Sequence, residues 1–215
     1  MRLDLGFIVP ALFITAPALA QVVIDAPNDF LPTYTGPQGG DLDVLTTQAF
    51  LNTSANTISV TTTVNAAIGT TPGGFYVFGF NRGAGTQRFV GGTPSVGAGV
   101  SFDLVLLLRP DGTSQVNDLV SGINTILPSG SVIISGSTIS SAPLALSLFT
   151  SRGFAPSDYT FNLWPRVSTV SGNAAISDFA PDASNAGLTI VPTPGAAVVL
   201  ASAGLVAMRR RRAAR

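Results

Sequence analysis

Glycine and proline interrupt this chain at short intervals, which restricts it to short secondary-structure elements. The sequence contains 23 Gly and 15 Pro among 215 residues, and both residues disfavour the interior of helices. The segments between them are rich in Thr, Ser, Val, Ile and Phe, which favour strands. Turn signals recur about every 8 to 15 residues, close to the spacing of β-sandwich domains. The pattern predicts an all-β fold.

Alternation of side chains indicates how the strands are arranged. In residues 57–64, Ile58, Val60 and Val64 fall on one face and hydroxyl residues on the other, so one face is expected to be buried. Residues 75–80 and 102–108 are apolar on both faces, as central strands of a two-layer sandwich are. We predict a two-layer antiparallel β-sandwich, jelly-roll-like, over residues 21–190. Its other expected strands are 41–51, 132–134, 138–139, 144–149 and 159–163.

The composition excludes several kinds of chemistry. Every basic residue is Arg and every acidic residue is Asp, and the chain has no His, Cys, Lys or Glu. Imidazole-based triads, cysteine nucleophiles, zinc sites of the usual kind, haem and iron–sulfur ligation and disulfides are therefore excluded. Any metal ion must be one that prefers oxygen ligands.

Charge is distributed unevenly along the chain. Residues 21–190 carry five Arg against ten Asp, a net charge of −5, because the other six Arg lie near the two ends. An acidic body disfavours nucleic acid as a partner.

The first twenty residues have the features of a secretory signal peptide. Residues 7–20 are apolar apart from Thr15 and follow Arg2. They end in Ala18-Leu19-Ala20, the small-x-small pattern that signal peptidase reads. Cleavage is predicted before Gln21, and a buried N-terminal strand is the alternative.

In the C-terminal segment, prolines, apolar residues and arginines follow one another in the order typical of a membrane helix. Pro192 and Pro194 prevent a helix from extending back beyond Gly195. Residues 195–208 carry no charge, and these 14 residues would form a helix of about 21 Å, against a hydrocarbon core of about 30 Å. Four arginines follow and would remain in the cytoplasm: Arg209, Arg210, Arg211 and Arg212. We predict a short apolar transmembrane helix at the C-terminus.

Residues 191–215 resemble the PEP-CTERM sorting signal of bacteria. The resemblance rests on Val191-Pro192-Thr193-Pro194-Gly195, the apolar stretch of small residues and the arginine cluster. Thr193 stands where that signal usually has an acidic residue. The resemblance implies export, recognition by an exosortase-type membrane protease, and location in the cell envelope or extracellular matrix with at least transient membrane attachment. A plain tail anchor and a buried Ala-rich helix are the alternatives.

Acidic residues at the start of the body form a candidate calcium site. Two clusters flank a Pro/Gly-rich turn, 32–40, and their oxygens could converge on Ca²⁺, which takes six to eight oxygen ligands. The alternative is that Asp and Asn here make local Asx-turns and need no ion. A second acidic group follows the same logic: Asp178, Asp182 and Asn185. The first candidate set is Asp25, Asn28, Asp29, Asp41 and Asp43.

Two further features are candidates for ligand binding. The Gly-rich run 81–89 brings Arg82 and Arg88 together with backbone donors that would suit an anionic or sugar ligand. Trp164, the only Trp in the chain, could stack on a sugar ring if it were exposed. The alternatives are a hairpin tip whose Arg pairs with Asp, and an indole that packs in the interior.

The body also resembles, over about 40 residues, bacterial surface β-sandwich modules of the DOMON or carbohydrate-binding type. The resemblance rests on Asp25-x-x-Asn28-Asp29 followed by Asp41-x-Asp43-Val44. Haem is excluded because the chain has no His. We expect a non-enzymatic envelope or matrix protein. The alternatives are a carbohydrate-binding module and a glycoside hydrolase that uses two Asp, for example Asp103 with Asp158.

Overall fold

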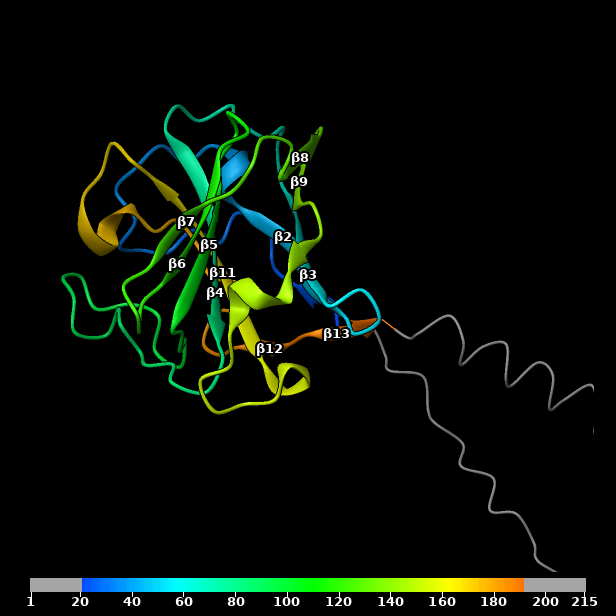
Figure 1. Ribbon diagram of the computed structural model, residues 1–215. Helices are drawn as coiled ribbons and strands as arrows, with labels where there is room; N and C mark the ends of the chain where they lie inside the picture. The colour runs from blue at the N-terminus through cyan, green and yellow to red at the C-terminus, as the bar shows by residue number, and fades with distance from the viewer. Residues whose placement is uncertain (1–20, 192–215) are drawn as a thin grey trace, which may run out of the picture.

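The computed structural model describes residues 21–191, which fold into two β-sheets packed face to face (Figure 1). The prediction of a two-layer β-sandwich is therefore confirmed. The seven-stranded sheet contains β1 (Val23–Ile24), β2 (Val44–Asn52), β3 (Thr57–Val64), β8 (Val132–Ser135), β9 (Thr138–Ser141), β10 (Leu144–Ala145) and β13 (Thr189–Val191). The six-stranded sheet contains β4 (Gly74–Asn81), β5 (Leu104–Leu108), β6 (Ser114–Asp118), β7 (Asn124–Ile126), β11 (Thr160–Val167) and β12 (Ala186–Gly187).

The helical elements in residues 21–191 are all short 3-10 turns. They are η1 (Gly40–Leu42), η2 (Leu146–Phe149), η3 (Pro156–Asp158) and η4 (Gly172–Ala175). The first of these explains why β2 begins later than the predicted 41–51 strand, since the backbone closes a turn from Gly39 to Leu42 before it extends.

The β2–β3 hairpin follows the alternation read from the sequence. Ile58, Val60 and Val64 are buried, and so is Thr62, whereas the hydroxyl residues of the other face are more exposed: Thr57, Ser59, Thr61 and Thr63. The turn is closed by Asn52, whose side-chain oxygen accepts a hydrogen bond of 2.9 Å from the N–H of Ala55. Asn56 completes it with a φ of 51°, a left-handed conformation that Asn tolerates. Local polar groups thus set the register that turns the apolar face inward.

The main core lies between the two sheets. From the seven-stranded sheet it takes residues such as Val44, Leu51 and Ile58, and from the six-stranded sheet Phe78 and Phe80. Burial of each such side chain contributes about 1.5–3 kcal/mol. This core holds the two layers together.

The six-stranded sheet has a second apolar cluster on its outer face, as expected from segments apolar on both faces. Val77 and Trp164 project there and pack against Phe89, Phe102 and Phe179 from the long connecting segments. Gly79 lies beneath Trp164, and an added Cβ at this position would collide with the indole ring. This sheet is therefore covered on both sides over part of its area.

The connectivity differs from a jelly roll in one sheet and from a purely antiparallel arrangement in the other. Strands β4, β5, β6 and β7 pair in sequence order as a meander, whereas a jelly roll uses Greek keys. Strand β13 pairs with β2 in parallel. It follows β12 directly, so the chain passes from one sheet to the other within residues 186–191.

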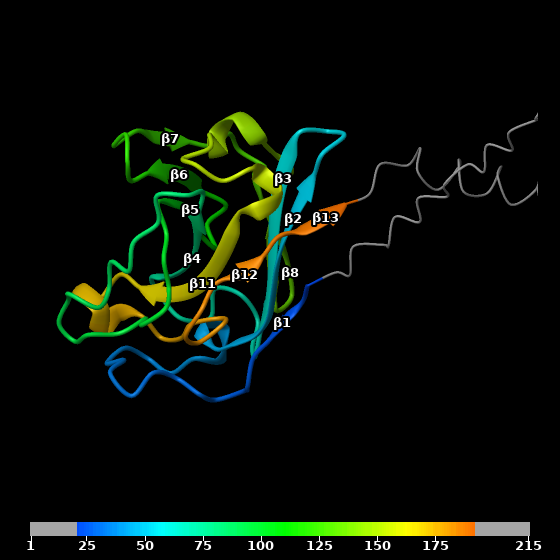
Figure 2. The same ribbon diagram turned by 90° about the horizontal axis from the view of Figure 1, so that it is seen from below.

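Both ends of the described chain lie at one edge of the seven-stranded sheet (Figure 2). Strands β1 and β13 pair with successive parts of β2, and the N–H of Gln21 donates to Thr189 Oγ1 at 3.0 Å. Within residues 21–191, no helix is long and apolar enough to cross a membrane. The predicted signal peptide and C-terminal helix lie outside the described residues.

Candidate metal centre

Five aspartates from three parts of the chain converge at one end of the sandwich. Asp25 and Asp29 follow β1, Asp43 precedes β2, and Asp178 and Asp182 lie in the segment between β11 and β12. Carboxylate oxygens of Asp25, Asp29 and Asp182 lie within 4.8 Å of one another, and so do those of Asp29, Asp43 and Asp178. Asp29 belongs to both groups. We call these five residues the aspartate cluster.

Asp43 is the buried centre of this cluster. Its side chain is fully buried, and its Oδ2 accepts hydrogen bonds from the N–H of Asn28 at 2.9 Å and from Asn65 Nδ2 at 2.8 Å. Its Oδ1 is buried and has no hydrogen-bond partner. A buried carboxylate oxygen without a partner is costly, because it has lost its water and gained nothing in return.

Other oxygens of the cluster share this state. Asp25 Oδ2 and Asp29 Oδ1 are also buried without a hydrogen-bond partner. Asp178, in contrast, is held in place by backbone groups, because its two oxygens accept from the N–H of Val44 at 2.9 Å and of Phe179 at 2.7 Å. The cluster therefore combines fixed carboxylates with unpaired oxygens, an arrangement that a cation would complete.

Burial and mutual repulsion raise the pKa values of three of the five carboxyl groups, those of Asp25, Asp29 and Asp178. The pKa of Asp178 is raised to about 8, mainly by burial and further by the charges of Asp25 and Asp29. Burial and the neighbouring Asp29 and Asp182 raise the pKa of Asp25 to about 7, and burial also raises that of Asp29. Without a cation the cluster thus resists full ionisation at neutral pH.

The donor set fits a hard divalent ion. It consists only of oxygens, held by irregular loops, which suits Ca²⁺ better than the strict octahedron of Mg²⁺ or the nitrogen and sulfur ligands of zinc. No Arg neutralises the cluster, because the ion pairs among residues 21–191 involve only Asp103 and Asp118 as acids.

The structure unites the two acidic groups that were predicted separately, and leaves three of their members outside the aspartate cluster. Asp41 is not part of the cluster: its carboxylate accepts from the N–H and hydroxyl of Thr71. Asn28 contributes its backbone N–H, as described above. Asn185 bonds instead to the backbone of Ser101, at 2.7 Å for Nδ2 to the carbonyl oxygen. Asp178 and Asp182, weaker candidates in the sequence, complete the cluster.

Arg82 belongs to a different, internally neutralised site. Its guanidinium is fully buried, and its Nε donates to Asp103 Oδ1 at 2.7 Å while Nη2 lies 3.1 Å from Asp118 Oδ2. Arg152 Nη2 also donates to Asp118, at 2.8 Å. Arg82 is therefore not available to a ligand, which corrects its place among the ligand candidates. Asp103, fully buried in the same pair, is equally closed to a substrate.

Arg88 and Trp164 do come together, on the outer face of the six-stranded sheet. They line a hollow of about 470 Å³ with Asn117, Arg166 and several apolar residues. Trp164 is only 1% exposed, and Phe89 and Phe102 pack against its ring, with centroids 5.1 and 4.7 Å away. The indole therefore cannot serve as an exposed stacking platform.

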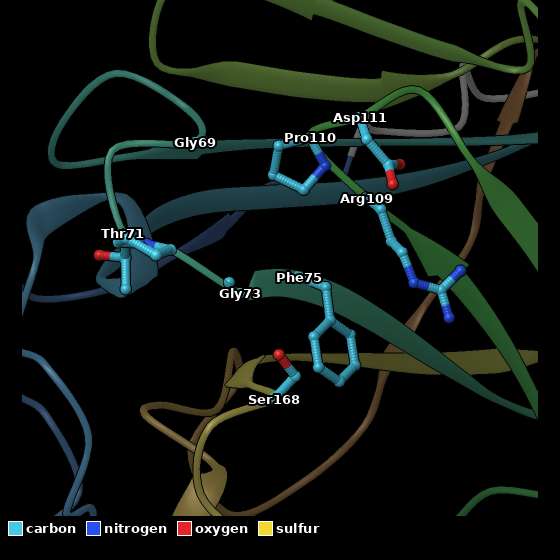
Figure 3. Close-up of a pocket in the computed structure, with 10 residues that line it drawn as sticks. Gly69, Thr71, Gly73, Phe75, Arg109, Pro110, Asp111 and Ser168 are labelled. Carbon is cyan, nitrogen blue, oxygen red and sulfur yellow. The ribbon is translucent and has the colours of Figure 1, made fainter.

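Figure 3 shows a second hollow, of about 500 Å³. It is lined by Gly73, Arg109 and Ser168, among others, and it shares Phe75 with the first hollow. The Arg109 guanidinium lies 6.0 Å from the centroid of the Phe75 ring. Sequence reasoning did not select Arg109, Asn117 or Arg166, because strand alternation alone does not separate a groove from an ordinary solvated face.

Comparison with known proteins places the chain in no family: no protein-family model, curated protein or solved structure matches it.

Proposed function

We propose that this chain is an exported, non-catalytic protein of the bacterial cell envelope or extracellular matrix, whose β-sandwich body is completed by a bound calcium ion. The observation that carries the calcium part is Asp43. This carboxylate is fully buried and has an unpartnered oxygen, and it lies among other carboxylates with no Arg paired to them.

A calcium ion would relieve two unfavourable features of the cluster, its unpaired buried oxygens and the repulsion between its carboxylates. It would give the unpaired oxygens of Asp25, Asp29 and Asp43 a partner, and it would offset the repulsion that raises the pKa values of Asp25 and Asp178. Because the cluster joins the start of β2 to the segment before β12, the ion would fasten distant parts of the chain. This supports a structural role for the ion.

The placement of the chain ends supports the proposed attachment. Gln21 and Val191 lie at the same edge of the seven-stranded sheet, so the sorting segment would leave the body where the signal peptide is removed. The opposite parts of the sandwich would then face away from the membrane. Sorting by an exosortase-type protease remains part of the proposal, on the strength of the C-terminal sequence.

A non-catalytic role is supported by what surrounds the candidate acids. Asp103 is buried in an ion pair with Arg82. An Asp103–Asp158 glycosidase pair would therefore lack an accessible carboxylate at Asp103. The aspartate cluster, for its part, has the oxygen-rich character of an ion site. The second candidate, a sugar-binding module, is favoured by the hollow that Arg88 and Arg166 line on the six-stranded sheet.

Thermal unfolding of the full-length chain tests the calcium site. At a hundredfold excess of free calcium over its dissociation constant, binding to the folded state contributes about 2.7 kcal/mol, which raises the Tm by about 5–10 °C for a chain of this size. We expect this rise with calcium, a smaller one with magnesium, and none with chelator.

Two variants give this experiment a matched control. Asp43→Asn removes the buried charge and is expected to abolish the calcium response. Asp111→Asn changes an Asp in an exposed turn, and the response should persist. If wild-type Tm is the same with calcium and with chelator, the calcium site is refuted.

The export part has its own measurement. In a bacterium that carries an exosortase, mass spectrometry of the mature protein should find an N-terminus at Gln21 and no arginine cluster. A mature chain that retains residues 209–212 would refute processing of the tail.

A further inference from the structure

The arginines of the body are divided between two environments. Two of the five, Arg82 and Arg152, are engaged with Asp103 and Asp118. The other three line the two hollows: Arg88 and Arg166 line the hollow on the outer face of the six-stranded sheet, and Arg109 lines the hollow where β4 begins and β5 ends. In a body with a net charge of −5, this face concentrates positive charge, with Asp111 as the acid among the lining residues.

The two hollows share Phe75 in their linings, and we refer to them together as the arginine groove. Strand register explains its floor, because Phe75 and Val77 on β4 pair with Arg166 and Trp164 on β11. Val77 in turn pairs with Leu107 on β5. These side chains share one face, and the two hollows meet at Phe75. Lining residues come from β4, β5, β6 and β11, and Phe75, Val77 and Leu107 provide an apolar floor.

Polar atoms without partners point to a missing ligand in this groove. Trp164 Nε1, Arg166 Nε and Asn117 Oδ1 are all buried and lack a hydrogen-bond partner, and all three residues line the 470 Å³ hollow. Trp164 is almost fully buried, so its N–H cannot turn to bulk water. Burial also lowers the pKa of Arg166, which reflects a poorly hydrated guanidinium that gains more from an anionic partner.

We propose that the arginine groove binds an acidic polysaccharide through its carboxylated sugar units. A sugar ring has an apolar C–H face that can lie on Phe75 and Leu107, as ligand sites commonly combine apolar walls with a few placed polar groups. Its hydroxyl groups can both donate and accept, as the unpaired Asn117 Oδ1 and Trp164 Nε1 require; because both atoms are buried, these two contacts form only after neighbouring side chains shift. Its carboxylate suits the planar guanidinium groups of Arg88 and Arg166.

Other anions satisfy the groove less completely. Inorganic phosphate has no apolar face for the Phe75 floor, and a neutral sugar leaves the arginines unpaired. An acidic peptide supplies carboxylates on flexible side chains, without the rigid array of hydroxyl groups that both donate and accept. The proposal goes beyond the envelope role and does not depend on the calcium site, which lies among other residues. The two can therefore fail separately.

Fluorescence of Trp164 provides a direct binding assay, because it is the only Trp in the full-length chain. We expect hexagalacturonate, a carboxylated oligosaccharide, to change its emission saturably in the presence of chelator. A neutral galactose hexamer should bind at least tenfold more weakly, and hexa-aspartate and inorganic phosphate likewise. Binding should weaken as salt is added, since part of it is charge attraction.

Variants then locate the site. Arg88→Gln and Arg166→Gln should each weaken hexagalacturonate binding about tenfold, and Asn117→Ala severalfold, with Tm recorded to verify folding. Arg215→Gln removes the same charge outside the described residues and should leave binding unchanged. Equal binding of the neutral hexamer or of hexa-aspartate would overturn the proposal. So would an absence of binding, or unchanged affinity in folded Arg88→Gln and Arg166→Gln variants.

Discussion

Two groups of aspartates in this protein have opposite electrostatic surroundings. Asp103 and Asp118 lie against Arg82 and Arg152, so their charges are balanced within the chain. The aspartate cluster contains five carboxylates and forms no ion pair among residues 21–191. Asp103 and Asp118 therefore have arginine counter-charges within the chain. The aspartates of the cluster have none among residues 21–191.

The pKa values follow this difference. Burial raises the pKa of Asp118, but hydrogen bonds from Arg152 and from the backbone of Ser121 and Val120 outweigh it and bring the pKa below its usual range. In the cluster, backbone hydrogen bonds from Val44 and Phe179 lower the pKa of Asp178, but burial and the neighbouring carboxylates outweigh them, and its pKa rises to about 8. Burial alone does not decide the ionisation of an aspartate; the partner does.

Removal of the internal partner should have the largest effect. Asp103→Asn leaves the buried Arg82 without its main counter-charge, and loss of one member of a buried pair costs about 3–5 kcal/mol of unfolding free energy. Urea denaturation measures this loss, which calcium should not restore. A cost below about 1 kcal/mol would mean that Asp118 alone can balance Arg82.

The second effect is a pH dependence of the calcium-free chain. The folded-state pKa values of Asp25 and Asp178 lie above the unfolded value of 3.8, so between about pH 4 and 8 the folded chain holds more protons than the unfolded chain. Its stability should fall as pH rises from 5 to 8, by more than about 1.4 kcal/mol, the equivalent of one pKa unit. Urea titrations with chelator at each pH give this slope.

The same titration separates the two groups. The lowered pKa of Asp118 has the opposite sign: its stabilisation is present above pH 4 and lost as pH falls further. Calcium should flatten the slope between pH 5 and 8 because it replaces protons at the cluster. Stability that is constant or rises over this range in chelator would contradict the repulsion that we assign to the cluster.

A smaller effect is expected from Asp25→Asn. This change relieves repulsion at a partly exposed position and keeps an oxygen to accept from the N–H of Ala26, so the calcium-free chain should gain less than about 1 kcal/mol, after allowance for solvent screening. Calcium affinity should fall about tenfold or more in isothermal titration. The two substitutions should change the unfolding free energy of the calcium-free chain in opposite directions. Asp25→Asn should raise it, and Asp103→Asn should lower it. Destabilisation in both would remove the distinction.

The smallest effect is expected from Asp111→Asn. Asp111 lies in an exposed turn and accepts from the N–H and hydroxyl of Thr113, at 2.8 and 2.7 Å. The amide oxygen of Asn can accept the same bonds, so the Tm should be unchanged with or without calcium. A calcium-dependent shift here would show that the ion acts through net charge rather than through the cluster.

Much of the fold could be read from local pattern. The alternation in 57–64 predicted a strand with one buried face, and the apolar segments 75–80 and 102–108 predicted strands with both faces covered. Local patterns of this kind depend on the two-residue period of a strand, which the chain carries in itself. The connectivity was less accessible, because the pairing of β13 with β2 joins residues far apart in the sequence.

The candidate sites show the same limit. Asp25, Asp29 and Asp43 were selected because they are close in sequence, but Asp41, two residues from Asp43, bonds to Thr71 instead. Arg82 and Arg88 lie in one Gly-rich run, yet the first is buried beside Asp103 and the second faces the groove. Neighbours along a strand or turn point in different directions, so proximity in sequence does not establish a shared site.

The sequence by itself determined the residue chemistry of this protein: its lack of imidazole and thiol groups, its acidic body, its strand-rich pattern and the two terminal targeting segments that it predicts. Only the tertiary structure decided which charges meet. It brought Asp178 to Asp43 across the sandwich, gave Asp103 an arginine, and placed Arg88 and Arg166 beside an apolar floor without an acidic partner among residues 21–191. The physical reason is that electrostatic interactions depend on distance in space and on burial, and packing of the two sheets sets both.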